Sequence, residues 1–178
     1  VRAEIAEMVM DAAAAGTVRA LIARSADFYG PGRQAHSLLN LLVFERLAAG
    51  KPAQWLLSSG CRHSFTYTPD AGRGTALLGN AEDAYGQTWH LPTAVAAPTG
   101  EQWVEAVAAA LGAAPRLHVV SRAALTALGL VIAELRELRE LAYQYDREYR
   151  FLSAKFNARF HFEPTPPATA TGMSIATT

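Results

Sequence analysis

The sequence lacks the features that mark secreted, membrane or generally basic nucleic-acid-binding proteins. Its 178 residues include a single cysteine, Cys61, so an internal disulfide bond is excluded and we expect a cytoplasmic location. No run of 18 apolar residues occurs, so we expect no membrane span. The formal net charge is zero, which argues against nucleic acid as a partner. With 51% apolar residues, the chain is instead typical of a globular domain.

Motifs for metal binding and for serine hydrolysis are missing as well. The five histidines show no metal-ligand spacing, and neither H-x-x-x-H nor C-x-x-C occurs, so we predict no metal site. The G-x-S-x-G turn that exposes a nucleophilic serine is not found either. These absences exclude two large groups of hydrolytic enzymes.

The pattern of apolar residues alternates between helical and extended spacing. Residues 2–15 have helical spacing, Gly16 ends that helix, and residues 18–23 follow as an apolar run typical of a strand covered on both faces. Thr99 and Gln102 match a capping box before another helix. Further strands are predicted at 54–57, 64–67, 88–91 and 117–120, and further helices at 38–49, from 68, at 99–111, at 121–129, at 131–149 and from 153. This order predicts an α/β fold, with a small mixed sheet and flanking helices.

Glycine and proline divide the chain further. Residues 25–37 contain Gly30, Pro31 and Gly32 and are predicted to form a loop. The helix predicted from residue 68 contains three glycines, at 72, 74 and 79, which close packing against a neighbour would explain. Residues 1–163 are expected to form one folded portion. Residues 164–178 are rich in Pro, Ala and Thr and predict a flexible tail.

Four segments carry a resemblance to a known enzyme family. Residues 24–32 read R-S-A-D-F-Y-G-P-G, and residues 63–70 read H-S-F-T-Y-T-P-D. Residues 86–91 read G-Q-T-W-H-L, and residues 153–156 read S-A-K-F. In this order they resemble the R-x-x-N-x-Y-G-P-G, R-D-F-x-Y-V-x-D, G-x-x-Y-N-V and D-x-S-K-x segments of extended short-chain dehydrogenases/reductases. That family comprises the NAD-dependent epimerases and dehydratases, and bacterial sugar-epimerase-like members fit best.

The resemblance implies the C-terminal part of a Rossmann-type fold, without the N-terminal dinucleotide-binding half. Neither the Gly-rich turn G-x-x-G-x-x-G nor the family's Tyr-x-x-x-Lys pair occurs in the sequence. In the family, that Tyr exchanges a proton while hydride passes between the nicotinamide of NAD or NADP and a hydroxyl-bearing carbon. We therefore expect no catalytic residue in this chain, and no binding of NAD or NADP by these residues alone.

Five binding residues follow from the resemblance. Ser25 and Asp27 are expected beside the cofactor, and Asp27, Tyr29, His63 and Tyr67 are expected at the substrate. Structural interpretations remain open: Asp27 as a loop residue that bonds its own backbone, Tyr29 and Tyr67 as packing residues, and His63 as a locally hydrogen-bonded side chain.

Two neighbouring positions bear on the substrate. His63 replaces an Arg that pairs with a diphosphate in nucleotide-sugar members of the family, and His is a weaker phosphate ligand, which argues against a nucleotide sugar. Asp70 is interpreted as a residue that stabilises the N-terminus of the following helix rather than as a catalytic group.

Two functional hypotheses result. In the first, the chain supplies the substrate pocket and the nicotinamide-side wall of an NAD(P)-dependent oxidoreductase that acts on a small sugar-like molecule, and it is inactive by itself. In the alternative, it is a non-catalytic binding or dimerisation module derived from that family. The expected protein partner is a second copy, bound through the helix at 2–15, or the missing half. Neither nucleic acid nor a membrane is expected as a partner.

Overall fold

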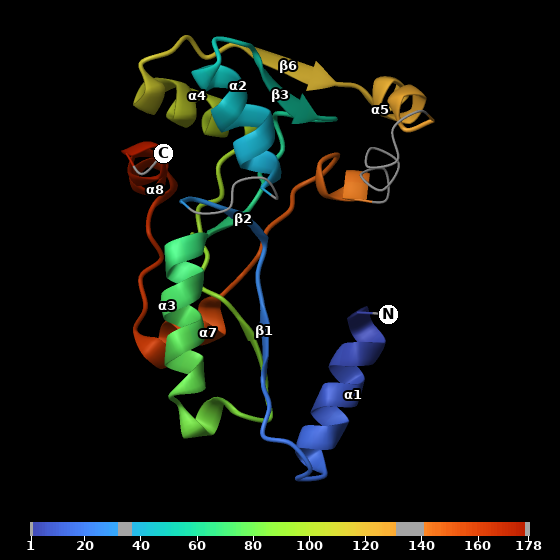
Figure 1. The fold of residues 1–178 in the computed structure, drawn as a ribbon, viewed down its shortest axis with the longest axis vertical. Helices are drawn as coiled ribbons and strands as arrows, with labels where there is room; N and C mark the ends of the chain where they lie inside the picture. The colour runs from blue at the N-terminus through green and yellow to red at the C-terminus, as the bar shows by residue number, and fades with distance from the viewer. Residues whose placement is uncertain (1, 32–36, 131–140, 177–178) are drawn as a thin grey trace.

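The computed structural model describes residues 2–31, 37–130 and 141–176, and Figure 1 shows an elongated α/β chain. The strands are β1 (Ile22–Arg24), β2 (Asp27–Tyr29), β3 (Ala53–Leu56), β4 (Phe65–Tyr67), β5 (Thr88–His90) and β6 (Leu117–Val120). The α-helices are α1 (Arg2–Ala14), α2 (Glu45–Ala48), α3 (Thr68–Gly79), α4 (Gly100–Leu111), α5 (Arg122–Leu128), α7 (Ala154–Phe160) and α8 (Pro167–Ala176). Three shorter helical segments are η2 (Asn40–Phe44), η3 (Glu82–Ala84) and η4 (Ala142–Gln144).

The strands pair in three separate ladders, all of them parallel. β1 pairs with β5, β2 with β4, and β3 with β6. Parallel partners need long crossover connections, and helices lie within each of these connections. The predicted α/β fold is thus confirmed, although the ladders are parallel where a mixed sheet was predicted. One isolated bridge, between Arg62 and Thr99, is antiparallel.

Two apolar cores hold the elements together. The larger core surrounds Trp103 on α4, where the side chains of β2, β3 and β4 meet those of η2. The smaller core surrounds Trp89 on β5 and the fully buried Phe156 on α7, beneath α3. Figure 1 shows β3, β6, α2 and α4 at one end of the molecule, with β1, β5 and α1 at the other. The β2–β4 ladder lies between these ends.

Short elements account for two differences from the sequence predictions. The predicted loop at 25–37 contains strand β2, which the pattern did not indicate because it is only three residues long and its partner β4 is distant in the sequence. Of the helix predicted at 131–149, residues 131–140 lie outside the described residues. Its last part is wrong, because η4 ends at Gln144 and the backbone N–H of Tyr149 donates to the carbonyl of Arg62 instead.

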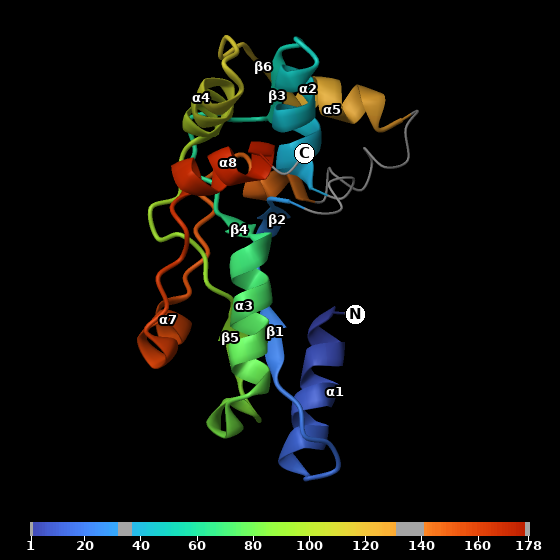
Figure 2. The same ribbon diagram turned by 60° about the vertical axis from the view of Figure 1, so that its left-hand side comes forward.

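The predicted flexible tail is wrong for residues 167–176, which form helix α8. This helix packs against α4, as Figure 2 shows, and it buries Ala170 and Thr171. The hydroxyls of Thr171 and Ser174 donate to carbonyls one turn earlier, so they enter the interface with their hydrogen bonds satisfied. The small residues of this segment, whose abundance predicted disorder, allow α8 to approach α4 closely.

The glycines of α3 divide into two kinds. A Cβ at Gly74 would lie 2.7 Å from Cδ of Pro92, so close packing is confirmed there. At Gly72 and Gly79 a Cβ would meet nothing within 4 Å, and the same explanation is wrong for them. The capping box of α4 is confirmed: Gln102 N donates to Thr99 Oγ1 at 3.2 Å, and Thr99 N donates to Gln102 Oε1 at 3.0 Å.

Across the described part of the chain, no helix combines the length and the apolar character needed to span a bilayer. The same residues hold no cluster of three or more His, Cys, Asp or Glu side chains that could bind a metal ion.

Candidate functional site

The β2–β4 ladder brings four of the five predicted site residues together. Asp27 begins β2 and Tyr29 ends it, while His63 lies just before β4 and Tyr67 ends that strand. Parallel register places Tyr29 directly beside Tyr67. Ser25 lies just beyond the last residue of β1. Ligands of open parallel α/β sheets bind beyond the carboxyl ends of the strands. Ser25, Tyr29 and Tyr67 lie at such ends, whereas Asp27 and His63 lie at the amino ends of β2 and β4.

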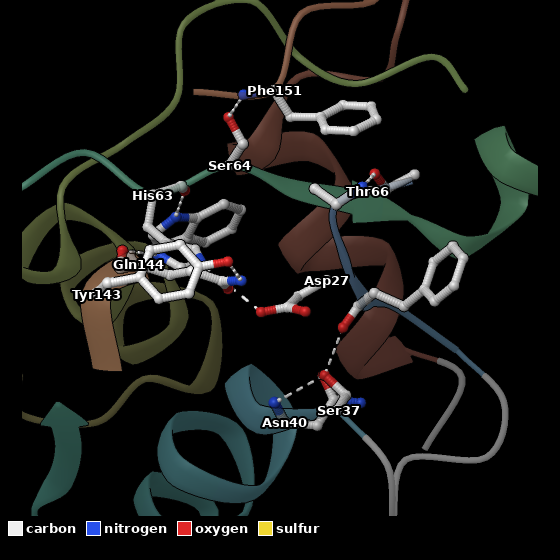
Figure 3. A network of polar contacts seen from close by, with 12 residues as sticks. Asp27, Ser37, Asn40, His63, Ser64, Thr66, Tyr143, Gln144 and Phe151 are labelled. Carbon is white, nitrogen blue, oxygen red and sulfur yellow. Dashed lines mark hydrogen bonds and ion pairs between the residues drawn. The ribbon is translucent and has the colours of Figure 1, made fainter. Parts of the chain in front are cut away.

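Asp27 and His63 face each other (Figure 3). Nε2 of His63 lies 3.6 Å from Oδ2 of Asp27, and the Asp27 side chain is 42% exposed whereas that of His63 is 2% exposed. The other ring nitrogen, Nδ1, lies 3.2 Å from the backbone oxygen of Gln144. One ring nitrogen of His63 is thus engaged by a backbone carbonyl that is distant in the sequence, whereas Nε2 has no hydrogen-bond partner.

Aromatic rings fix the orientation of the His63 imidazole. The ring stacks on Tyr145, with centroids 4.4 Å apart and planes inclined by 21°. Phe65 and Tyr149 flank it at 4.6 and 4.9 Å, and Trp55 meets it edge-on at 6.2 Å. Such a cage restricts rotation of the imidazole, so Nε2 stays directed at Asp27.

Tyr145 contributes a second buried polar atom to the cluster. Its hydroxyl makes no hydrogen bond of ordinary geometry, although a weaker hydrogen bond to Asp27 contributes to its raised pKa. Burial raises the pKa of Tyr145 far above its ordinary value, and the negative charge of Asp27 raises it further. Burial followed by the Asp27 charge also raises the pKa of Tyr149. Tyr145 therefore remains protonated at neutral pH and can donate a hydrogen bond. We call Asp27, His63 and Tyr145 the Asp27 cluster.

Tyr29 and Tyr67 are buried in the larger core. Their ring centroids lie 5.5 Å apart, and Tyr29 also meets Trp103 edge-on at 5.0 Å. Burial raises the pKa of Tyr29 far above its ordinary value. Packing explains both positions, and a substrate contact by either residue stays a prediction.

Ser25 lines a different feature, a cleft of about 680 Å³ between α1 and β1. Arg24 and His90 line this cleft as well. His90 is held by stacking on Phe151 at 4.4 Å and by a 2.9 Å contact between Nδ1 and the backbone oxygen of Leu152. Ser25, which was expected at the cofactor, thus lines a cleft whose lining does not include Asp27, His63 or Tyr145.

Sequence reasoning missed Tyr145 and Tyr149 as neighbours of the predicted site. Both fall in the helix predicted at 131–149, yet they lie in a segment after η4 that runs beside His63. A signal was available: three tyrosines occur within seven residues, at 143, 145 and 149, among charged side chains. Asp70 lies in the first turn of α3, as predicted.

Comparisons with known proteins give structural matches only. No protein-family model matches the sequence, and no curated protein sequence matches it. UDP-glucose 4-epimerase from Thermus thermophilus, solved with NAD, matches with a TM-score of 0.71 and 15% identity over 96% of this chain and 50% of its own. dTDP-glucose 4,6-dehydratase from Bacillus anthracis, also with NAD, matches with a TM-score of 0.71 and 14% identity over 96% and 48%. An epimerase from Methanothermobacter thermautotrophicus matches with a TM-score of 0.73 and 12% identity over 94% and 45%.

These matches define the extent of the similarity. The chain spans about half the length of each solved structure, and nearly all of its own residues take part. At identities of 12–15%, the similarity establishes the fold and leaves the chemistry to be argued from the site.

Proposed function

Because this chain has the fold of a partial extended short-chain dehydrogenase/reductase, we propose that it forms the substrate side of an NAD(P)-dependent epimerase- or dehydratase-like oxidoreductase. The observation that carries this proposal is the Asp27 cluster, in which the buried Nε2 of His63, which makes no hydrogen bond, and the buried Tyr145 hydroxyl lie beside a half-exposed carboxylate. Buried polar groups without partners are rare in folded proteins, and the position of this one beside an accessible carboxylate supports a binding role.

The Asp27 cluster binds and orients in this proposal, and it does not perform the redox chemistry. The Asp27 carboxylate, whose side chain is 42% exposed, accepts a hydrogen bond from a substrate hydroxyl, and the buried Tyr145 hydroxyl donates to that carboxylate and orients it. The aromatic cage around His63 keeps water from one side of the cluster. By fixing the substrate in one orientation, the Asp27 cluster assists a reaction that other groups complete.

The residues of this chain do not fit a complete dinucleotide. The cleft beside Ser25 could contact one ring of such a cofactor, but the sequence contains no Gly-rich turn to hold a pyrophosphate. We therefore assign the chain no step of hydride transfer. The intact protein that we propose uses NAD or NADP, acts on a sugar-like molecule and resides in the cytoplasm.

A ligand titration of the ¹⁵N-labelled chain tests this function. We expect methyl α-D-glucopyranoside to shift the backbone resonances of Asp27, Ser64 and Tyr145, with small or no changes around α5. We expect neither NAD nor NADP to shift any resonance at millimolar concentration. Tight binding of either dinucleotide would show that the cofactor site is misplaced, and a glycoside that leaves the Asp27 cluster unchanged would refute the assignment of the substrate side.

A dimerisation module is the second candidate, and one observation favours it. Helix α1 buries none of its side chains, and Ile5 and Met8 are 54% and 68% exposed. Exposed apolar side chains on one helix commonly mark an association surface. Light scattering should then give twice the monomer mass, and Met8→Glu should halve it. A monomeric wild-type chain at 100 µM, roughly the concentration at which weak interfaces assemble, would count against this candidate.

A further inference from the structure

The cleft between α1 and β1 has the size of a small-molecule site and differs in lining from the Asp27 cluster. Its volume is about 680 Å³, within the range of roughly 300–1,000 Å³ that ligand pockets occupy. Among the described residues that line it, Asp27, His63 and Tyr145 do not occur. A ligand in this cleft would therefore contact other side chains than the proposed substrate does.

The chain reverses between α1 and β1, and this reversal places two arginines at the same end of the cleft. α1 runs toward a turn that follows Ala14, and β1 runs back beside it, as Figures 1 and 2 show. Arg2 begins α1, Arg24 ends β1, and both residues line the cleft. Neither guanidinium forms a hydrogen bond or an ion pair with another described residue. Because arginine stays protonated in proteins, this end of the cleft carries two positive charges that no described carboxylate pairs with.

The rest of the cleft is lined mainly by apolar groups. The acidic residues of α1, which are Glu4, Glu7 and Asp11, are not among the described residues that line it. Beyond the two arginines, the helix and the strand contribute small or apolar side chains together with one serine: Ala3, Ile5, Ala6, Val9, Ile22, Ala23 and Ser25. His90 and Phe151, stacked with centroids 4.4 Å apart, add an aromatic surface. From Arg2 to Val9 the helical wall is about 10 Å long, at 1.5 Å of rise per residue.

We propose that the cleft between α1 and β1 is a second ligand site, which binds a small carboxylate with an apolar body. The carboxylate lies at the end that carries Arg2 and Arg24, and the Arg24 guanidinium donates to it, since the planar guanidinium matches a carboxylate in shape and charge. The apolar body lies along Ile5 and Val9 and removes them from water; Ile5 is 54% exposed in the unliganded chain. An anion without such a body, for example inorganic phosphate, leaves these side chains exposed and binds weakly.

Cinnamate and cinnamamide provide the test, because they share one apolar body and differ in charge. We expect cinnamate to shift the backbone ¹H–¹⁵N resonances of Ala6, Ala23 and Ser25 in the wild-type chain and to leave that of Tyr145 unchanged. Its affinity should exceed that of cinnamamide about tenfold, which is the effect of one charge-assisted hydrogen bond. Raising NaCl from about 50 mM to about 500 mM should remove most of this difference, because salt screens charges that are accessible to solvent.

Arg24→Gln separates the charge from the apolar contact. We expect this variant to lose about tenfold in affinity for cinnamate and to bind cinnamamide like the wild-type chain. Ile5→Ser should weaken the binding of both compounds, because it removes apolar surface that they share. Arg19→Gln is the matched control, since Arg19 is an exposed arginine that pairs with Glu82 and is not among the residues that line the cleft. This control should bind both compounds like the wild-type chain.

Three results would overturn this inference. They are equal affinities of the wild-type chain for cinnamate and cinnamamide, an Arg24→Gln variant that binds cinnamate like the wild-type chain, and a titration in which cinnamate shifts no resonance around the cleft. If the last result accompanies twice the monomer mass in light scattering, a second copy of the chain covers the cleft instead. The glycoside titration of the Asp27 cluster is independent of all three results, so the proposed function and this inference can fail separately.

Discussion

Gly100→Ala is expected to lower the free energy of unfolding by about 3 kcal/mol, at the upper end of what overpacking a core costs. A Cβ at Gly100 would lie 2.5 Å from Cε2 of Trp55, inside the contact distance of any two carbon atoms. The Trp55 ring cannot move aside freely, because it is buried and contacts His63, Phe65 and Tyr145 edge-on. Urea denaturation followed by tryptophan fluorescence measures the change.

Gly72→Ala is the control for that substitution. Gly72 is also a helical glycine, but a Cβ there would meet nothing within 4 Å. Alanine lowers the entropy of the unfolded chain relative to glycine, so the control should stabilise the protein by about 0.5–1 kcal/mol. Equal unfolding midpoints for the two variants would mean that the contact between α4 and Trp55 is not as close as described.

Asp70→Ala is expected to lower the free energy of unfolding by about 3 kcal/mol and to release the C-terminal segment, because it leaves partly buried hydrogen-bond donors without their acceptor. The Asp70 side chain is fully buried, and its carboxylate accepts from the backbone N–H of Thr165 at 2.7 Å and from the Thr165 hydroxyl at 2.9 Å. Arg73 donates to the same carboxylate. One carboxylate thus joins the start of α3 to the segment that leads into α8.

Limited proteolysis distinguishes a released segment from general unfolding. In Asp70→Ala we expect cleavage between residues 161 and 176 at temperatures where the wild-type chain resists, before the tryptophan signal of the larger core is lost. Asp83→Asn, which removes an exposed carboxylate, should leave both the proteolysis pattern and the unfolding midpoint unchanged. If residues 161–176 of Asp70→Ala resist cleavage as they do in the wild-type chain, Asp70 does not anchor the C-terminal segment.

Local signals made much of the fold predictable. The capping box at Thr99 and Gln102 and the αL glycine Gly112 define both ends of α4, and each acts within one turn of helix. The extended runs that include Trp55, Trp89 and Val119 form strands near their predicted places. Such elements depend on neighbouring residues, so a pattern read along the chain can find them.

Non-local contacts were not predictable in the same way. The sequence indicated Asp27 and His63 separately as binding residues, but their contact depends on the register of β2 against β4. Tyr145 reaches the same place from a third segment, and Thr165 reaches Asp70 from a fourth. No periodic pattern within a single segment predicts these contacts. The composition of residues 164–178 even argued for disorder, which the packing of α8 on α4 overrides.

The backbone resonances of the Asp27 cluster give the most direct test of whether it is the substrate side of the pocket. The account predicts that methyl α-D-glucopyranoside shifts the ¹H–¹⁵N resonances of Asp27 and Tyr145 in the wild-type chain, and that Asp27→Asn reduces these shifts, because the exposed carboxylate accepts the hydrogen bond from the ligand. Resonances that stay unchanged in the wild-type chain, or shifts of the same size in Asp27→Asn, would contradict the account.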